Sequence, residues 1–254
     1  MLNYPLNQLP DRTHKPRTSG LTMIMDKGLS VREAEDFLSV AASHADIIKL
    51  GWATSAVTDN LEAKLDVYRA AGIPFYLGGT LLEAFYIRGQ IDEYLRVLDK
   101  YKIGHLEVSD GSIDISETEK CQLISRLAQN FTVLSEVGSK NPDKVLRPSQ
   151  WIEMMQRELD AGSWKVIAEA RESGTVGMFR GDSSIRGDLI GEILDVISPE
   201  SVLWEAPQKS QQVWFIKLLG TNVNLGNIAP VDAIPLETLR LGLRGDTFHT
   251  FMNQ

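Results

Sequence analysis

Charged side chains in this sequence gather directly after short apolar runs. Glu136 and Lys140 follow one such run across a glycine, Glu169 and Arg171 follow the next, and Glu205 ends a third. A lysine in such a place can have its pKa tuned toward neutrality and can act as a general acid or base. A carboxylate beside a guanidinium suits a metal ion together with an anionic substrate. The residue types therefore predict proton transfer and anion binding.

Several of these positions also have a structural interpretation. Alternation along an extended chain places Glu169 and Arg171 on one side, where they would equally form an internal salt bridge. Lys49 ends another apolar run and, because lysine is rarely buried unpaired, needs a carboxylate or an anionic ligand nearby. Thr80 follows two glycines that form either an anion cradle or a tight turn with Thr80 as the helix N-cap.

The last predicted strand, residues 222–225, contains Asn222 and Asn224 and is followed by Gly226. In barrels that bind phosphorylated substrates, the last two strand-to-helix loops commonly hold the phosphate. Asn and Gly also simply make turns. The alternatives at this position are therefore a phosphate site and an ordinary turn.

The four histidines show no metal-ligand spacing, so oxygen atoms would hold any metal ion. Carboxylates, amide oxygens and water suit Mg²⁺. The single cysteine, Cys121, lies in a helical stretch and is expected to be inert.

Eight short apolar runs, each followed by a turn and a helical pattern, must position these residues. The predicted strands are residues 21–26, 47–49, 75–78, 105–109, 132–136, 165–169, 202–205 and 222–225. The predicted helices are residues 31–42, 60–71, 116–129, 149–161, 188–197, 209–219 and 236–243. Eight strand-helix units in about 250 residues predict an α/β fold, a (β/α)₈ TIM barrel whose active site lies at the carboxyl ends of the strands.

The barrel is expected to form a single domain over residues 17–254, preceded by an N-terminal arm over residues 1–16. Two connections are longer than barrel loops require, residues 138–149 and 174–188, and both are expected to be lids or binding segments rather than solvated excursions.

The acidic balance limits the partners of the protein. With 26 basic and 34 acidic residues, a net charge of −8 and a pI near 5.1, the chain is not expected to bind nucleic acid or an anionic membrane. No charged-then-apolar leader and no long apolar run is evident, and one cysteine cannot form an internal disulfide. A cytoplasmic protein is expected, and a homo-oligomer is compatible with the sequence.

The sequence resembles the phosphosulfolactate synthase family from Arg17 to Thr247. Nine motifs carry the resemblance in order: Arg17–Thr22 with Asp26–Gly28, Lys49–Trp52 with Thr54, Gly78–Glu83, Val108–Gly111, Ser135–Gly138, Glu169–Gly174, Glu205–Pro207, Asn222–Leu225 and Leu236–Arg240. The resemblance implies a Mg²⁺-dependent barrel that adds sulfite to phosphoenolpyruvate. The product would be (R)-2-phospho-3-sulfolactate, an early intermediate of coenzyme M biosynthesis.

The resemblance and the strand-end positions together imply roles for the catalytic residues. Lys140 is expected to protonate C2 of the substrate, and Glu136 lies beside it as a catalytic residue and metal ligand. Glu169 and Glu205 are further candidate Mg²⁺ ligands, directly or through water. The family motif often reads Glu-Val-Gly-Lys-Lys, whereas Ser139 replaces the first of those lysines here.

The remaining assignments concern substrate binding. Lys49 and Arg171 are expected to face the carboxylate, phosphate or sulfonate oxygens, and Asn222 and Asn224 to orient them. The motif residues Arg17 and Thr80 complete this expected substrate-binding set.

Two other functions compete with the synthase. One is a different Mg²⁺-dependent enolate enzyme that acts on phosphoenolpyruvate or a related acid. The other is a non-catalytic, stress-related barrel of the same family. A barrel without catalysis is expected to lose charges at its strand ends, and this sequence retains most of them, with Ser139 the exception.

Overall fold

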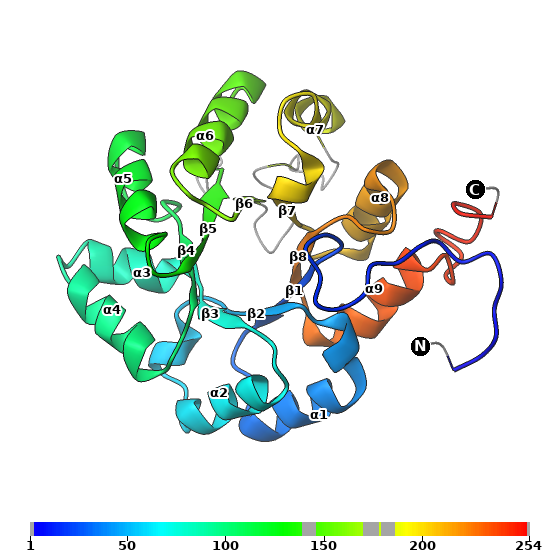
Figure 1. Ribbon diagram of the computed structural model, residues 1–254, viewed down its shortest axis with the longest axis horizontal. Helices are drawn as coiled ribbons and strands as arrows, with labels where there is room; N and C mark the ends of the chain where they lie inside the picture. Colours follow the sequence, from blue (N-terminus) through cyan, green and yellow to red (C-terminus); the bar gives the residue numbers. More distant parts are fainter. Residues whose placement is uncertain (1–2, 139–145, 170–177, 179–185, 253–254) are drawn as a thin grey trace.

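The computed structural model describes residues 3–138, 146–169, 178 and 186–252. In these residues strands alternate with helices (Figure 1). The strands are β1 (Thr22–Asp26), β2 (Ile47–Leu50), β3 (Phe75–Leu77), β4 (His105–Val108), β5 (Thr132–Val137), β6 (Lys165–Ala168), β7 (Val202–Glu205) and β8 (Leu225–Ile228). The α-helices are α1 (Val31–Ala41), α2 (Leu61–Ala70), α3 (Gly79–Tyr86), α4 (Ile91–Lys100), α5 (Glu117–Leu127), α6 (Pro148–Asp160), α7 (Gly187–Leu194), α8 (Lys209–Leu219) and α9 (Ala233–Arg240).

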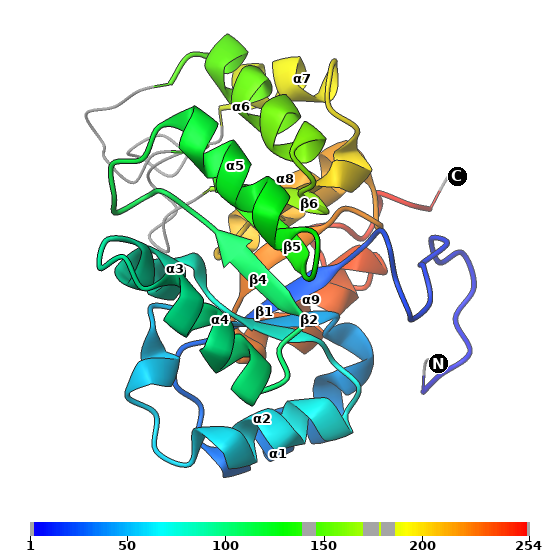
Figure 2. The same cartoon turned by 60° about the vertical axis from the view of Figure 1, so that its left-hand side comes forward.

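All strand pairs are parallel, and the ladder runs in the order β3, β2, β1, β8, β7, β6, β5, β4. The helices surround the strands on the outside, as Figures 1 and 2 show from two directions. At the junction between the end strands β3 and β4, the Gly79 N–H donates to Glu107 Oε1 at 2.8 Å. The chain is a nearly closed (β/α)₈ barrel in one domain, which confirms the predicted fold.

The strands are buried on both faces, because one face meets the helices and the other meets the barrel interior. Ile24 and Ile48 face outward, in the same apolar core as helix residues such as Leu65 and Phe215. A separate apolar cluster fills the interior and is called the interior plug here: Leu21, Met23, Ile47, Tyr76, Leu134, Ile167 and Leu203. The alternation of side chains along each strand thus separates the two cores.

Polar residues fix where the strands pass into helices. The carboxylate of Asp26, at the end of β1, accepts hydrogen bonds from Gly28 N and Leu29 N and from the Tyr68 hydroxyl. Lys64 of α2 pairs with the same carboxylate at 2.8 Å, and both side chains are fully buried. Asp26 therefore anchors α2 to the strand end and faces away from the barrel interior.

Two helices begin with a capping box built on a serine. Ser30 accepts from the Glu33 N–H ahead of α1, and Ser116 accepts from the Glu119 N–H ahead of α5. In each case the glutamate returns a hydrogen bond to the backbone of the capping serine. Serines in these places satisfy backbone donors that the helix itself leaves without partners.

The predicted position of the last strand is wrong. The observed strand β8 begins at Leu225, where the predicted strand ended, so Asn222 and Asn224 precede the strand. Gly226 lies inside β8. A Cβ at this position would approach Met23 Cε to 2.8 Å, so the position requires glycine. The glycine that resembles a turn signal is therefore required by close packing in the barrel interior.

Helix α9 also begins three residues before the predicted start at Leu236. Its third residue is Pro235, and the first turn of a helix accommodates proline because the proline nitrogen has no intrahelical partner to lose. The predicted boundary therefore fell too late.

Candidate active site

A layer of charged side chains lies directly above the interior plug, at the carboxyl ends of the strands. Lys49 comes two residues after Ile47 of the plug, and Glu136 comes two residues after Leu134. Glu169 and Glu205 follow Ile167 and Leu203 by the same spacing. Because side chains on one face of a strand recur every second residue, the apolar floor and the charged layer belong to the same inward face.

Lys49 is the centre of this layer. Its Nζ lies 2.9 Å from Glu107 Oε2 and 3.5 Å from both Glu136 Oε2 and Glu205 Oε1. Lys49 is only 5% exposed. Burial alone would lower the pKa of Lys49, but the charges of Glu107, Glu205 and Glu136 outweigh burial and hold the pKa well above its ordinary value. The structure thus brings three predicted residues, Lys49, Glu136 and Glu205, together.

Glu107 is a member of this cluster that the predicted site did not include. It lies on β4, two residues after His105, and its Oε1 accepts the Gly79 N–H. A Cβ on Gly79 would approach Glu107 Oε1 to 2.8 Å, so the glycine allows this close contact. The signal for Glu107 was present in the sequence, because a carboxylate followed an apolar residue near the end of a predicted strand.

Tyr76 closes the floor of the cluster on the β3 side. It is fully buried, and burial together with the neighbouring Glu107 carboxylate raises the pKa of Tyr76 well above its ordinary value. The phenol therefore stays neutral beneath the charged layer.

Behind Glu136 lies a second buried cation, Lys120 of α5. Its Nζ donates to the Glu136 backbone carbonyl at 2.6 Å and lies 2.7 Å from Glu158 Oε1 and 2.9 Å from Asp110 Oδ1. Burial lowers the pKa of Lys120, but Glu158 and Asp110 raise it more strongly. This network fixes the end of β5, which carries Glu136.

Glu169 follows β6 and is buried beside the end of β5. A Cβ on Gly138 would lie 2.7 Å from Glu169 Cβ and 3.0 Å from a ring carbon of Trp151. Gly138 also has a φ of 146°, a conformation that side chains disfavour. The glycine after Glu136 therefore lets Glu169 pack against the neighbouring strand end.

Thr80 lies within α3 as its second residue, half-buried at the same end of the barrel. Gly78, rather than Thr80, is the N-cap of this helix. A Cβ on Gly78 would approach Lys49 Cε to 3.3 Å. The glycine pair packs against Lys49 and Glu107, and the interpretation of Thr80 as the N-cap is wrong. The anion cradle at this turn stays a prediction.

Three predicted substrate-binding residues lie at the opposite end of the barrel. Arg17 pairs with Asp46 at 2.9 Å, and Asp46 precedes β2. Asn224, which precedes β8, accepts from Leu21 N and donates to the carbonyl groups of Glu200 and Val202. Asn224 therefore joins the amino ends of strands.

Asn222 belongs to the same end and holds the N-terminal arm. Its Oδ1 accepts from Thr13 N at 3.0 Å and from Arg12 at 3.1 Å, while its Nδ2 donates to the Asp11 carbonyl. The structure does not bring Arg17, Asn222 or Asn224 to the Lys49 cluster, because β8 begins later than predicted and these residues precede their strands.

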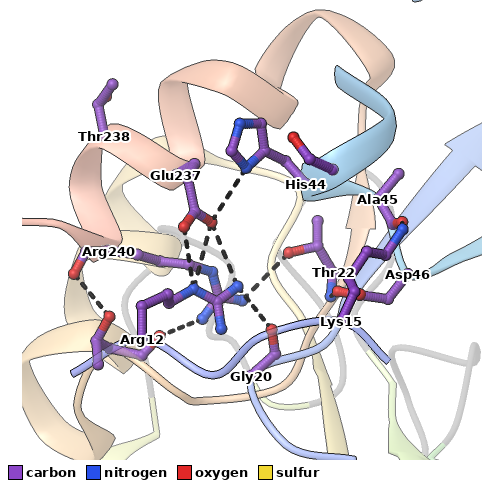
Figure 3. A network of polar contacts seen from close by, with 12 residues as sticks. Arg12, Lys15, Gly20, Thr22, His44, Ala45, Asp46, Glu237, Thr238 and Arg240 are labelled. Carbon is purple, nitrogen blue, oxygen red and sulfur yellow. Dashed lines mark hydrogen bonds and ion pairs between the residues drawn. The ribbon is translucent and has the colours of Figure 1, made fainter. Parts of the chain in front are cut away.

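Figure 3 shows the polar network that closes this amino end. Arg12 pairs with Glu237 of α9 at 3.1 Å. The fully buried Arg240 donates to the carbonyl groups of Thr221, Val223 and Leu21 at 2.6, 2.7 and 3.1 Å. Burial lowers the pKa of Arg240 to about 9. This end of the barrel is built for stability.

Two predicted site residues, Lys140 and Arg171, lie outside the described residues, and so does most of each long connection, 138–149 and 174–188. Their assignments stay predictions.

The candidate metal ligands fit Mg²⁺ by donor chemistry, since Glu136, Glu169 and Glu205 offer only carboxylate oxygens. Within residues 3–138, 146–169, 178 and 186–252, no three metal-binding side chains form a ready-made cage. Mg²⁺ usually keeps several waters and uses one or two carboxylates together with substrate phosphate, so a closed cage is not required.

In the described part of the chain, every helix is too short or too polar to span a lipid bilayer.

Solved structures share this fold. The 3-hexulose-6-phosphate synthase of Salmonella typhimurium is 15% identical, with a TM-score of 0.57 over 88% of this chain and 100% of that one. The phosphoenolpyruvate phosphomutase of Streptomyces platensis subsp. rosaceus is 12% identical, with a TM-score of 0.52 over 85% of this chain and 78% of that one. At such identities the likeness shows the barrel fold alone.

Sequence relatives are much more similar. The phosphosulfolactate synthase of Methanocaldococcus jannaschii is 45% identical over 235 residues, which cover 90% of this chain and 94% of the relative. The enzymes of the same name from Methanothermobacter thermautotrophicus and Bacillus subtilis are 41% and 39% identical over 244 residues, which cover 94% and 95% of this chain and 95% and 97% of the relatives. The family model for (2R)-phospho-3-sulfolactate synthase (ComA) matches residues 10–246. A match over almost the whole barrel, with the charged layer at its carboxyl end, shows that this chain belongs to the phosphosulfolactate synthase family of enzymes.

Proposed function

We propose that this protein adds sulfite to phosphoenolpyruvate and forms (R)-2-phospho-3-sulfolactate. The observation that carries the proposal is the family match over residues 10–246, with relatives of that name at 39–45% identity. The buried charged layer of Lys49, Glu107, Glu136 and Glu205 supports it, because barrel enzymes build their sites at that end.

The reaction makes one carbon–sulfur bond and moves one proton. The sulfur of sulfite attacks C3 of phosphoenolpyruvate, and the electron pair of the C2–C3 double bond moves toward the carboxylate to give an enediolate. A proton then reaches C2 from one face. Stabilising the charge on the enediolate is the larger part of the task, because such electrostatic terms usually dominate catalysis.

The residues of this chain divide the work. Lys140 is proposed as the acid that delivers the proton to C2, as the sequence predicts. The Lys49 ammonium contacts the carboxylates of three glutamates. It would bind a substrate carboxylate in place of one of these glutamate carboxylates. Glu136, Glu169 and Glu205 would hold Mg²⁺, directly or through water, and a bound Mg²⁺ would supply positive charge opposite the enediolate.

The test of the activity is consumption of phosphoenolpyruvate with and without sulfite. Consumption that requires sulfite and yields a phosphorylated sulfonate is the expected result. Consumption without sulfite would instead identify another phosphoenolpyruvate enzyme, and no turnover under any divalent cation would identify a non-catalytic barrel.

The test of the metal is removal by a chelator, followed by titration of Mg²⁺ back into the protein. Turnover should stop and return, and calorimetry should show weaker Mg²⁺ binding in Glu136→Gln and Glu169→Gln. Full activity of the demetallated protein would refute the Mg²⁺ assignment.

A further inference from the structure

Glu107 holds Lys49 more closely than the other carboxylates do, although it is neither a proposed acid nor a proposed metal ligand. Lys49 Nζ lies 2.9 Å from Glu107 Oε2, compared with 3.5 Å from an oxygen of Glu136 and of Glu205. Glu107 is only 1% exposed. A buried carboxylate stays charged only where protein donors replace its hydration, and those donors also determine how firmly it is held.

Both oxygen atoms of the Glu107 carboxylate have partners within the protein. Oε2 is paired with Lys49, and Oε1 accepts the Gly79 N–H at 2.8 Å. Gly79 is the first residue of α3, where the helix dipole favours a nearby negative charge. Glu107 is therefore held by a backbone group that does not depend on Lys49.

The two glycines ahead of α3 and at its start contact both members of this ion pair. A Cβ on Gly78 would lie 3.3 Å from Lys49 Cε. A Cβ on Gly79 would lie 2.8 Å from Glu107 Oε1. Gly78 N–H also donates to the carbonyl of Leu50, the residue after Lys49, at 2.9 Å. The lysine and the glutamate are therefore packed against the same turn.

The end of β4, which carries Glu107, is tied to the same helix. The Ser109 hydroxyl donates to Glu83 Oε1 of α3, and the Gly111 N–H donates to the same oxygen at 3.0 Å. Because β3 and β4 are the end strands of the ladder, these contacts join β4 to the helix that follows β3. The position of Glu107 is thus set by β4 and α3 together.

An incoming substrate carboxylate has to displace one of the three carboxylates around Lys49. The lysine ammonium has three N–H donors, so three carboxylates can occupy all of them. Glu136 and Glu205 lie farther from Nζ, and as proposed Mg²⁺ ligands they have another cation to bind. Glu107 has the shorter contact and the backbone partner, and it is the carboxylate least able to leave.

We infer that Glu107 is the positioning residue of Lys49 and keeps the ammonium in place while a substrate carboxylate replaces Glu136 or Glu205. This inference rests on the proposed function, in which the substrate carboxylate is that of phosphoenolpyruvate. Glu107 acts through Lys49 and does not contact the substrate. Without the charge of Glu107, the ammonium would move toward Glu136 and Glu205 and would bind a substrate anion less well.

The first test is a double-mutant cycle on the affinity for phosphoenolpyruvate. Calorimetry with Mg²⁺ and without sulfite measures this affinity with no turnover. Glu107→Gln keeps an oxygen that can accept the Gly79 N–H but removes the charge, and it should weaken binding about tenfold. In a Lys49→Met background the same change should alter the affinity by less than about twofold, because a residue that acts through Lys49 has no effect without it.

The second test separates the charge of Glu107 from its packing. Glu107→Asp keeps the charge in a shorter side chain and should recover part of the affinity that Glu107→Gln loses, whereas a packing defect would be at least as large in the aspartate variant. Glu237→Gln is the matched control, since Glu237 is a buried glutamate paired with Arg12 at the amino end of the barrel. It should leave the affinity within about twofold of the wild type.

Three results would overturn the inference alone. They are wild-type affinity in Glu107→Gln, a further loss of the same size when Glu107→Gln is added to Lys49→Met, and a Glu107→Asp variant that binds no better than Glu107→Gln. The last comparison decides by itself if Lys49→Met does not fold. A protein that shows the expected cycle but consumes no phosphoenolpyruvate with sulfite would refute the proposed function and retain the role of Glu107.

Discussion

Neighbouring carboxylates make the burial of the Lys49 ammonium possible. Lys49 is 5% exposed, and three carboxylates have oxygen atoms within 3.5 Å of its Nζ. Without Lys49 the three carboxylates would repel one another. Without the carboxylates, the desolvation of the lysine ammonium would be strongly unfavourable. The cluster is therefore a unit, and its members cannot be assigned separate contributions.

Removal of the lysine alone should expose this dependence. Lys49→Met should lower the free energy of unfolding by about 3–5 kcal/mol at neutral pH, because it leaves buried carboxylates without their counter-ion. The double variant Lys49→Met/Glu107→Gln should recover part of that loss. Urea denaturation of the two singles and the double gives the coupling energy, and strictly additive losses would contradict the unit.

Lys140 carries the sharpest chemical prediction. Lys140→Met should lower kcat by about 10²- to 10⁴-fold, the usual contribution of general acid catalysis, without loss of thermal stability. Steady-state kinetics with phosphoenolpyruvate and sulfite, together with a melting curve, measure both. If only the KM rises, Lys140 anchors an anion and another group donates the proton.

Residue types and their spacing predicted Lys49, Glu136 and Glu205 because each ends a short apolar strand, and strand ends meet at one end of a barrel. Glu107 directly precedes the Val108–Gly111 motif near the end of a strand, but the sequence analysis assigned it no chemical role. Which charges meet inside a barrel depends on side-chain length and on close glycine contacts, and a sequence pattern does not encode these.

At the scale of elements, glycines determine how closely neighbouring strand ends approach. Gly79, Gly138 and Gly226 all lie where a Cβ would collide with a side chain of the next strand. A pattern of glycine after an apolar run resembles a turn in each case, but in β8 it marks an interior contact. That ambiguity is the reason why the last strand was predicted three residues too early.

The packing interpretation of Gly79 is testable against a glycine in open space. Gly79→Ala should lower stability by about 1–3 kcal/mol, because the new methyl group overlaps Glu107 and Ser109. Gly104→Ala is the control, since a Cβ at Gly104 meets nothing within 4 Å. Chemical denaturation compares them, and equal stabilities would contradict the packing argument.

A variant of Asn224 shows whether this side chain contributes to stability or to substrate binding. Asn224→Ala should lower the free energy of unfolding by about 1–3 kcal/mol, since it leaves the buried N–H of Leu21 and two carbonyl groups without their partner. The KM for phosphoenolpyruvate should not change. A raised KM at unchanged stability would return Asn224 to the substrate site, as first predicted.

At the scale of the whole molecule, the two ends of the barrel do different work. The carboxyl end carries the glutamates and Lys49, while the amino end carries Arg12 and Arg240 with their carboxylate and carbonyl partners. Carboxylates that share one lysine lie where chemistry is proposed. Hydrogen bonds from arginine side chains to backbone carbonyl groups lie where the chain is held closed.

Two histidines at the amino end should make stability depend on pH. Burial lowers the pKa of His44, with the nearby arginines adding to the effect against Glu237, and burial lowers the pKa of His105. The unfolded chain then takes up protons first, so stability is fully present above about pH 6.5 and falls as the pH drops below it.

The histidine effect can be isolated by substitution. Between pH 7.5 and pH 5.5 the urea midpoint of the wild-type protein should fall more than that of His44→Gln/His105→Gln. His249→Gln, a change at an exposed position, should behave like the wild type. A double variant that loses as much stability as the wild type would assign the pH dependence to other groups.

Arg240 has a consequence for how the protein is made. It binds carbonyl groups at the beginning of β1 and ahead of β8, so the first and last strands are secured by a residue near the end of the chain. During translation the amino-terminal strands leave the ribosome first, and the edge of β1 must wait for its final neighbour. The nascent chain therefore carries an open sheet edge through almost all of its synthesis, and a message truncated ahead of the Arg240 codon should yield a substrate for chaperones and proteases rather than a closed barrel.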